Sequence, residues 1–232
     1  MKFLIDEEFG DIAIRYYPSS RSLRFRLTPK GALTISAPTR TSKLTLSHSV
    51  ESNRTVIRQM IADSRKDVSY DKNMPIGKSH RLAIIVSSLH GNLKIHTKDR
   101  IIYAYTDSID SIKVKESQQL IQKEVIKALK KEAKAYLPRR LKHLAERHGY
   151  EYEATRLTHA GTRWGSCSSS GTISLNIALM KLEPELIDYV LLHELCHTSE
   201  MNHSESFWSE LERADPHYKL HRRTIKRFSP AL

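Results

Sequence analysis

The chain has few cysteines and no long apolar run, and each shortage removes a class of protein. Cys167 and Cys196 are the only cysteines among 232 residues, too few for the disulfide framework of a small secreted domain, so we expect both to be reduced. No apolar stretch is as long as the about 20 residues that a helix needs to cross a bilayer. The opening residues, MKFLIDEEFG, also lack the apolar segment of a secretory signal. We therefore expect a cytoplasmic protein that does not span a membrane.

Acidic residues are scarce relative to basic ones. The chain has 38 Lys and Arg against 26 Asp and Glu, a formal net charge of +12. Basic residues concentrate in 122–143 and 219–227. Such an excess favours nucleic acid as a partner, because neutralised phosphates release counterions. The alternative is that these side chains only solvate helix faces. No zinc-finger or RNA-binding signature decides between the two.

The first half of the sequence is predicted to be mostly β. Apolar residues alternate with polar ones over residues 11–37, which predicts an antiparallel meander with a turn at Pro29-Lys30-Gly31. A helix is predicted over 42–64 and a linker over 71–78. Further strands are predicted at 82–86, 93–96 and 101–105, with a hairpin turn at Gly91-Asn92. No internal repeat is evident, and we expect this β region to cover residues 1–110.

The second half changes to helical periodicity. Apolar residues recur every three or four positions from 116 to 148, which predicts a long amphipathic helix that Pro138 kinks or divides. Two strands are expected at 154–164 and 172–177, joined by a GSCSSSG turn. Pro184 then opens another helix. The fold class is therefore α+β, with a helical core over residues 111–232.

The helix that follows Pro184 contains the motif His193-Glu194-Leu195-Cys196-His197. Histidines at positions i and i+4 lie on one helix face, so both imidazoles can bind one ion, for which Zn²⁺ is the usual choice. Glu194 projects near the ion without filling its coordination sphere, where it can take a proton from water that the metal activates. This pattern predicts a zinc-dependent hydrolase of the peptidase type that binds one Zn²⁺ per chain and acts on a protein or peptide.

A catalytic zinc site needs a third protein ligand and an open fourth position. We predict His203 as that ligand, on condition that the helix ends before it and the chain turns back. Asn202 is the expected cap of a second helix, in a capping box with Glu205. Glu200, Glu205 and His217 are the competing third ligands.

A family resemblance supports this interpretation. Residues 162–208 resemble the YgjP-like metallopeptidase domain family, the bacterial relatives of the WLM domain and, more distantly, of the SprT and Spartan proteases. Arg163-Trp164-Gly165-Ser166-Cys167, the histidine motif, His203 and Phe207-Trp208 carry the resemblance. It implies a minimal zincin fold, a cytosolic bacterial protein, His193, His197 and His203 as metal ligands, and Glu194 as general base.

Several assignments remain open at this point. Asn176 and Trp164 are predicted to contact the substrate, although core packing is the alternative for Trp164. Tyr218 and His217 are candidates for stabilising the oxyanion. A protease that acts on DNA-bound proteins is one rival function. A non-catalytic structural zinc module is another, and it would need Cys196 or Glu200 as a fourth ligand.

Overall fold

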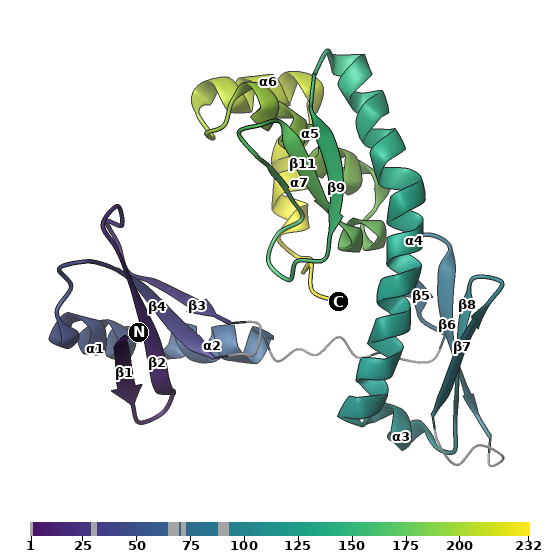
Figure 1. The fold of residues 1–232 in the computed structure, drawn as a ribbon, viewed down its shortest axis with the longest axis horizontal. Helices are drawn as coiled ribbons and strands as arrows, with labels where there is room; N and C mark the ends of the chain where they lie inside the picture. The colour runs from purple at the N-terminus through teal and green to yellow at the C-terminus, as the bar shows by residue number, and fades with distance from the viewer. Residues whose placement is uncertain (1, 29–31, 65–69, 71–72, 88–92) are drawn as a thin grey trace. The chain divides into compact units, whose positions relative to one another are not determined.

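The computed structural model describes all residues except 1, 29–31, 65–69, 71–72 and 88–92 (Figure 1). Its strands are β1 (Lys2–Asp6), β2 (Gly10–Tyr17), β3 (Arg24–Leu27), β4 (Leu33–Pro38), β5 (Pro75–Ile76), β6 (His80–Val86), β7 (Lys94–Lys98), β8 (Ile101–Thr106), β9 (Ala154–Thr158), β10 (Gly165–Cys167) and β11 (Thr172–Asn176). Its helices are α1 (Lys43–Ser52), α2 (Arg54–Ser64), α3 (Ile109–Lys113), α4 (Lys115–His148), the 3-10 helix η1 (Ile177–Lys181), α5 (Pro184–Ser199), α6 (Glu205–Ala214) and α7 (Tyr218–Ile225). The α+β class with an N-terminal β region is confirmed.

The chain forms two compact units, Met1–Asp67 and Val68–Leu232, and each has its own hydrophobic core. The expected division after residue 110 falls inside the second unit, within α3. The reason is that the inward side chains of β6 and β8, among them Leu82, Ile84 and Ile102, bury themselves in the same core as α4. The second sheet therefore belongs with the helical part of the chain.

The first unit is a four-stranded sheet with two helices on one face. Its strand order is β1-β2-β4-β3. Alternate residues such as Ile12, Ile14 and Ile35 point inward and are buried against Leu46 and Val50 of α1, with Ile57 of α2 in the same core. The other face of the sheet carries basic and polar residues on β2, β4 and β3, and the exposed apolar Phe3 and Ile5 on β1.

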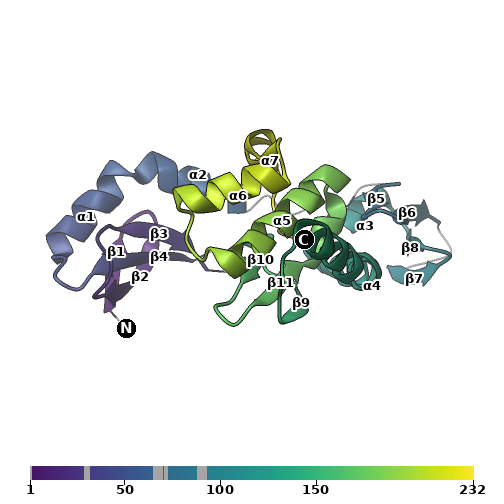
Figure 2. The same ribbon diagram turned by 90° about the horizontal axis from the view of Figure 1, so that it is seen from above.

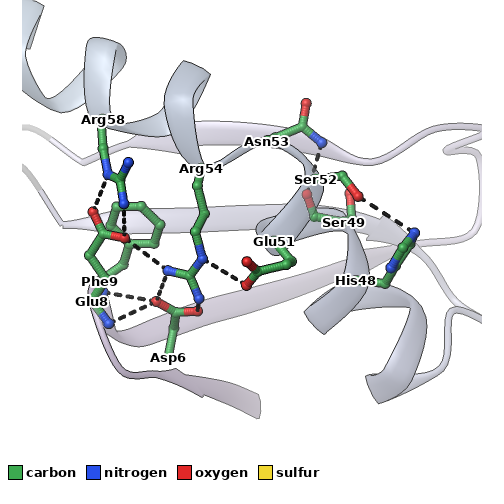
Figure 3. Close-up of polar contacts among 10 residues, drawn as sticks. All are labelled: Asp6, Glu8, Phe9, His48, Ser49, Glu51, Ser52, Asn53, Arg54 and Arg58. Carbon is green, nitrogen blue, oxygen red and sulfur yellow. Dashed lines mark hydrogen bonds and ion pairs between the residues drawn. The ribbon is translucent and has the colours of Figure 1, made fainter.

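A cluster of ion pairs holds α2 to the β1–β2 turn within this unit (Figure 3). The Arg54 guanidinium donates to Asp6, Glu8 and Glu51, and Arg58 donates to Glu8. Burial raises the pKa of Asp6, but hydrogen bonds from Phe9, Glu8 and Arg54 outweigh it and hold that pKa below its ordinary value. Asp6 and Glu8 are therefore paired with arginines of α2.

The second unit begins with a sheet of the same topology as the first. Its order is β5-β6-β8-β7, and in both sheets the outer pairs are antiparallel while the central pair is parallel. The expectation of a purely antiparallel region is therefore wrong for β2–β4 and for β6–β8. Alternation specifies which residues face the core but not which strands pair. The architecture is thus repeated where no repeat is evident in the sequence.

Helix α4 of the second unit is 34 residues long and is continuous through Pro138. It ends at Gly149, whose positive φ of 75° gives the left-handed cap that glycine adopts without steric cost. One side of α4 packs on the four-stranded sheet, and another packs on η1 and α5. Arg140 donates to both carboxylate oxygens of Asp188, at 2.8 and 2.6 Å, and so joins α4 to α5.

The C-terminal part places α5 against a three-stranded sheet, with α6 and α7 beside it (Figure 2). The sheet order is β10-β11-β9, so β11 is central and β10 is an edge strand. Two local predictions need correction: the predicted linker contains β5, and the predicted GSCSSSG turn begins as β10. The turns predicted at Pro29-Lys30-Gly31 and Gly91-Asn92 lie outside the described residues. None of the helices in the described part of the chain has both the length and the apolarity that crossing a membrane requires.

Candidate metal centre

Helix α5 places His193 and His197 on one face of a largely buried segment. Pro184 occupies the first turn, where its missing N–H costs nothing, and Leu191, Leu192 and Leu195 pack into the core. The His193 and His197 ring centroids are 4.9 Å apart. A rigid, buried helix thus fixes the spacing of the two imidazoles.

His203 reaches the same place because α5 stops in time. The helix ends at Ser199, and the Glu200 N–H closes its last turn on the Cys196 carbonyl. The next helix, α6, is capped by Ser204, whose hydroxyl accepts the Phe207 N–H at 3.2 Å. The expected cap at Asn202 is therefore wrong by two residues. The turn nevertheless returns His203 to α5, as the prediction requires.

The three imidazoles converge on one point. Within the described residues, the ligand atoms of His193, His197 and His203 all lie within 4.8 Å of one another. The Nε2 atoms of His193 and His203 are 3.1 Å apart. Nitrogens that bind Zn²⁺ at about 2.1 Å in a tetrahedron are separated by roughly 3.4 Å, so the spacing suits such an ion. The buried Nδ1 of His193 has no hydrogen-bond partner among the described residues, and an unsatisfied polar atom of this kind is costly to bury.

Neighbouring groups orient the rings. His197 Nδ1 lies 2.9 Å from the Glu200 carbonyl oxygen, to which it can donate, and this leaves Nε2 as the ligand atom. The Phe207 ring, which is fully buried, lies 4.6–5.0 Å from all three imidazoles. Trp208 stacks on His203 at 5.3 Å, and the Arg222 guanidinium lies 4.3 Å from the centre of the Trp208 ring. Contacts from the end of α5 and the start of α6 therefore fix the orientation of the three imidazoles.

Burial keeps two of these imidazoles neutral. It lowers the pKa of His193 to about 3, with smaller contributions from the charges of His197, His203 and Arg222. The pKa of His203 is also lowered, first by burial and then by His197 and Arg222. Metal ligation requires neutral imidazole, so the donor set fits a metal ion.

Glu194 is buried beside the edge strand β10, with 6% of its surface exposed. Burial raises its pKa to about 8, although the Arg163 charge and a hydrogen bond from the Cys167 backbone N–H lower it. A Cβ atom on Gly165 would lie 2.6 Å from Glu194 Oε1 and 2.7 Å from its Cγ. Only glycine leaves room for the carboxylate here. The sequence analysis missed both contacts.

The competing ligands lie elsewhere or serve other roles. Cys196 is buried, and its Sγ lies 3.2 Å from the Tyr150 hydroxyl. Glu200 contributes its backbone carbonyl to His197, while Glu205 and His217 lie outside the histidine group. Among the described residues this group offers three protein ligand atoms, the number that a site with an open position requires.

The prediction that Asn176 faces the substrate is wrong. Asn176 is fully buried at the end of β11, where its amide donates to the carbonyls of Ala160 and Arg163 at 2.6 and 2.8 Å. Its Oδ1 accepts the Ala178 N–H and so caps η1. All three hydrogen bonds are to groups of the chain itself, and β11 is the central strand of its sheet. The Asn176 side chain is therefore not available to a substrate. Trp164 is partly buried against the core, and its carbonyl accepts the Asn176 N–H.

Comparison with known protein families identifies a family for this chain. The model of the YgjP-like metallopeptidase domain matches residues 21–228. This chain belongs to that family. No curated protein matches it. Two crystal structures of metallopeptidase zymogens are similar to this YgjP-like chain: abylysin of Pyrococcus abyssi (31% identity, TM-score 0.36) and jannalysin of Methanocaldococcus jannaschii (21% identity, TM-score 0.35). Each match covers 39% of the YgjP-like chain and 93% of the zymogen.

Proposed function

We propose that this YgjP-like protein is a zinc-dependent peptidase in which His193, His197 and His203 hold the ion and Glu194 is the general base. The convergence of three imidazoles beside a buried carboxylate carries the proposal. A zinc ion in such a site acts as a Lewis acid on the scissile carbonyl and on water. Three protein ligands leave it a position for substrate or water.

The residues of the chain perform the remaining steps. Glu194 takes a proton from the attacking water and delivers it to the leaving amine. Cys167 N–H holds one end of that carboxylate, and Gly165 leaves room for it. His197, fixed by the Glu200 carbonyl, keeps its Nε2 toward the ion. The Arg222 charge close to His193 and His203 favours a negative charge developing at this site.

The substrate we infer is an extended protein or peptide segment. The edge strands of this sheet are β10 and β9, and β10 is the one that lies beside Glu194, so β10 is the strand at which an extended substrate could add. Trp164 immediately precedes β10 and remains the proposed substrate contact.

The test combines metal analysis with a substitution. Purified protein should carry about one equivalent of zinc. A chelator should abolish hydrolysis of an unfolded protein substrate, and added zinc should restore it. Glu194→Gln should keep the zinc yet lower hydrolysis by about 10² or more, the usual contribution of general acid–base catalysis. Undiminished hydrolysis in a zinc-replete Glu194→Gln variant would remove Glu194 from the mechanism.

The same assays distinguish the rival functions. A structural zinc module would show no hydrolysis by the parent protein at any zinc occupancy. A protease specialised for DNA-bound proteins would cleave its substrate faster when nucleic acid is added. Free protein substrate cleaved at the same rate with and without nucleic acid would argue against that specialisation.

A further inference from the structure

The outer face of the sheet in the first unit carries a row of arginines. Helices α1 and α2 cover the inner face (Figure 1). The outer side chains of β2, β4 and β3 are exposed or half-buried. Arg15 lies opposite Ser36, which in turn lies opposite Arg24, and Arg26 lies opposite Thr34. Neighbouring strands are about 4.8 Å apart, so Arg15 and Arg24 flank Ser36 across three strands.

These arginines keep their charge available. Within the part of the unit that the structure describes, Arg15, Arg24 and Arg26 form no ion pair, and all three are exposed. The acids Asp6, Glu8 and Glu51 are held instead by Arg54 and Arg58 (Figure 3). Asp11 is on the outer face, but it lies at the end next to the β1–β2 turn, opposite Ile5. The middle of the face is therefore positively charged.

A hollow of about 360 Å³ lies on this face, and hydroxyl groups and guanidinium groups surround it. Its lining residues are Tyr17, Ser19, Ser20, Arg24, Arg26 and Ser36. Guanidinium groups bind phosphate oxygens through paired N–H donors, and serine and tyrosine hydroxyls add single donors. The chemistry of the hollow suits a phosphodiester group.

We propose that this outer face binds single-stranded nucleic acid, with backbone phosphates at Arg15, Arg24 and Arg26. Tyr17 and Phe3, 43% and 52% exposed, stand on the same face and offer rings on which unpaired bases can stack. A single strand fits better than a duplex because a groove of B-DNA admits a helix or a two-stranded ribbon, not a four-stranded sheet. This surface is distinct from the helical basic segments that the sequence analysis singled out.

The experiment measures binding of the full chain to a labelled oligo(dT) or oligo(rU) of roughly 20 nucleotides, which exceeds the about 4–16 nucleotides that an OB-fold module covers. Fluorescence anisotropy is recorded over a salt series for the parent, for Arg24→Gln with Arg26→Gln, and for Tyr17→Ala. Lys130→Gln with Lys134→Gln is the matched control, since it removes the same charge from exposed positions of α4. Circular dichroism melts establish that each variant is folded.

We expect the arginine pair to weaken binding at least tenfold at about 50 mM salt. It should also reduce the slope of log affinity against log salt by about 1.4, since each single-strand phosphate contact contributes about 0.7. Tyr17→Ala should weaken binding about fivefold or more and leave the slope unchanged, because stacking releases no counterion. The lysine pair should change affinity less than about twofold.

Three outcomes would overturn the proposal. The first is the absence of binding by the parent at about 50 mM salt, where phosphate contacts are strong. The second is an equal loss in the lysine and arginine pairs, which would make the attraction a property of net charge. The third is equal competition by polyglutamate, which would show that the face recognises negative charge without phosphate or base. The readout is binding, so it is independent of whether the chain hydrolyses peptides.

Discussion

Gly165 determines where the Glu194 carboxylate can lie. A methyl group there would approach Glu194 Cγ to 2.7 Å, so Gly165→Ala has to displace that side chain. We expect zinc content to stay the same while the rate of hydrolysis falls, by up to about 10²-fold, because a displacement of about 1 Å at a catalytic group lowers the rate by that order. Gly161→Ala is the control, because a Cβ there would have no neighbour within 4 Å. Metal analysis and steady-state hydrolysis on both variants check the prediction, which fails if the two variants are equally active.

His203 is the residue on which the three-ligand assignment depends. Removing groups that only orient a ligand costs about 10–100-fold in metal affinity, so His203→Ala should cost more than that. Glu200→Ala keeps the backbone carbonyl that accepts from His197, and His217 lies outside the group, so both variants should bind zinc like the parent. Competition with a chromophoric chelator measures all three affinities. Equal affinities would rule out His203 as a ligand.

For individual residues, the sequence predicted the three histidines but not the residues that contact the site. Spacing of four residues on a helix is a local property, and it brought His193 and His197 together as expected. The contact between Gly165 and Glu194 joins residues far apart in the chain, so nothing local indicated it. Asn176 illustrates the opposite error, because a polar residue near a site can equally serve as a buried cap.

Among the elements, α4 is tied to the second sheet through one buried carboxylate. Glu132 accepts backbone N–H groups of Lys78, Ser79 and His80, and its Oε1 lies 2.6 Å from His80 Nδ1. Burial raises the pKa of Glu132, but these hydrogen bonds outweigh it and lower that pKa below its ordinary value of 4.5. The ionised carboxylate is therefore the stabilising form.

The stability contributed by Glu132 should depend on pH. Because the folded pKa is the lower one, the contribution is fully present above about 4.5 and is lost as pH falls toward the folded value. We expect Glu132→Gln to cost about 2–4 kcal/mol of unfolding free energy at pH 7, and the difference from the parent to shrink below pH ~4.5. Denaturant unfolding of both proteins at several pH values measures it. A difference that is constant with pH would mean that the charge plays no part.

The sequence predicted which segments are strands more accurately than it predicted which strands pair. Alternation in β2, β4, β6 and β8 indicated strands with one buried face, and the buried residues confirm it. The parallel central pairs were not predicted, because a hairpin and a crossover give the same alternation. The predicted alternative of two helices divided at Pro138 is wrong, because α4 is continuous through that residue.

For the whole molecule, two separate cores predict two separate unfolding transitions. The core around Ile35 shares no residue with the core that surrounds α5. Added zinc should raise the midpoint of the second unit only, since a ligand stabilises the unit whose folded state binds it. Ile35→Ala should lower the unfolding free energy of the first unit by about 2–4 kcal/mol. Calorimetry with and without zinc checks both effects, and a single transition that moves with zinc would show that the units unfold together.

Two sheets of one topology in a single chain also create a folding hazard. During folding, β8 could pair with β2, or β4 with β6, since each is a parallel central strand flanked by an antiparallel partner. Such strand exchange is a characteristic failure of repeated architectures. The two strands carry different outward residues: Thr34 and Ser36 on β4, but Tyr103 and Tyr105 on β8, where both rings stack with His96 of β7. If β8 paired with β2, it would lose that stacking and place the tyrosines beside Arg15, so we expect the difference between the two sheets to favour correct assembly.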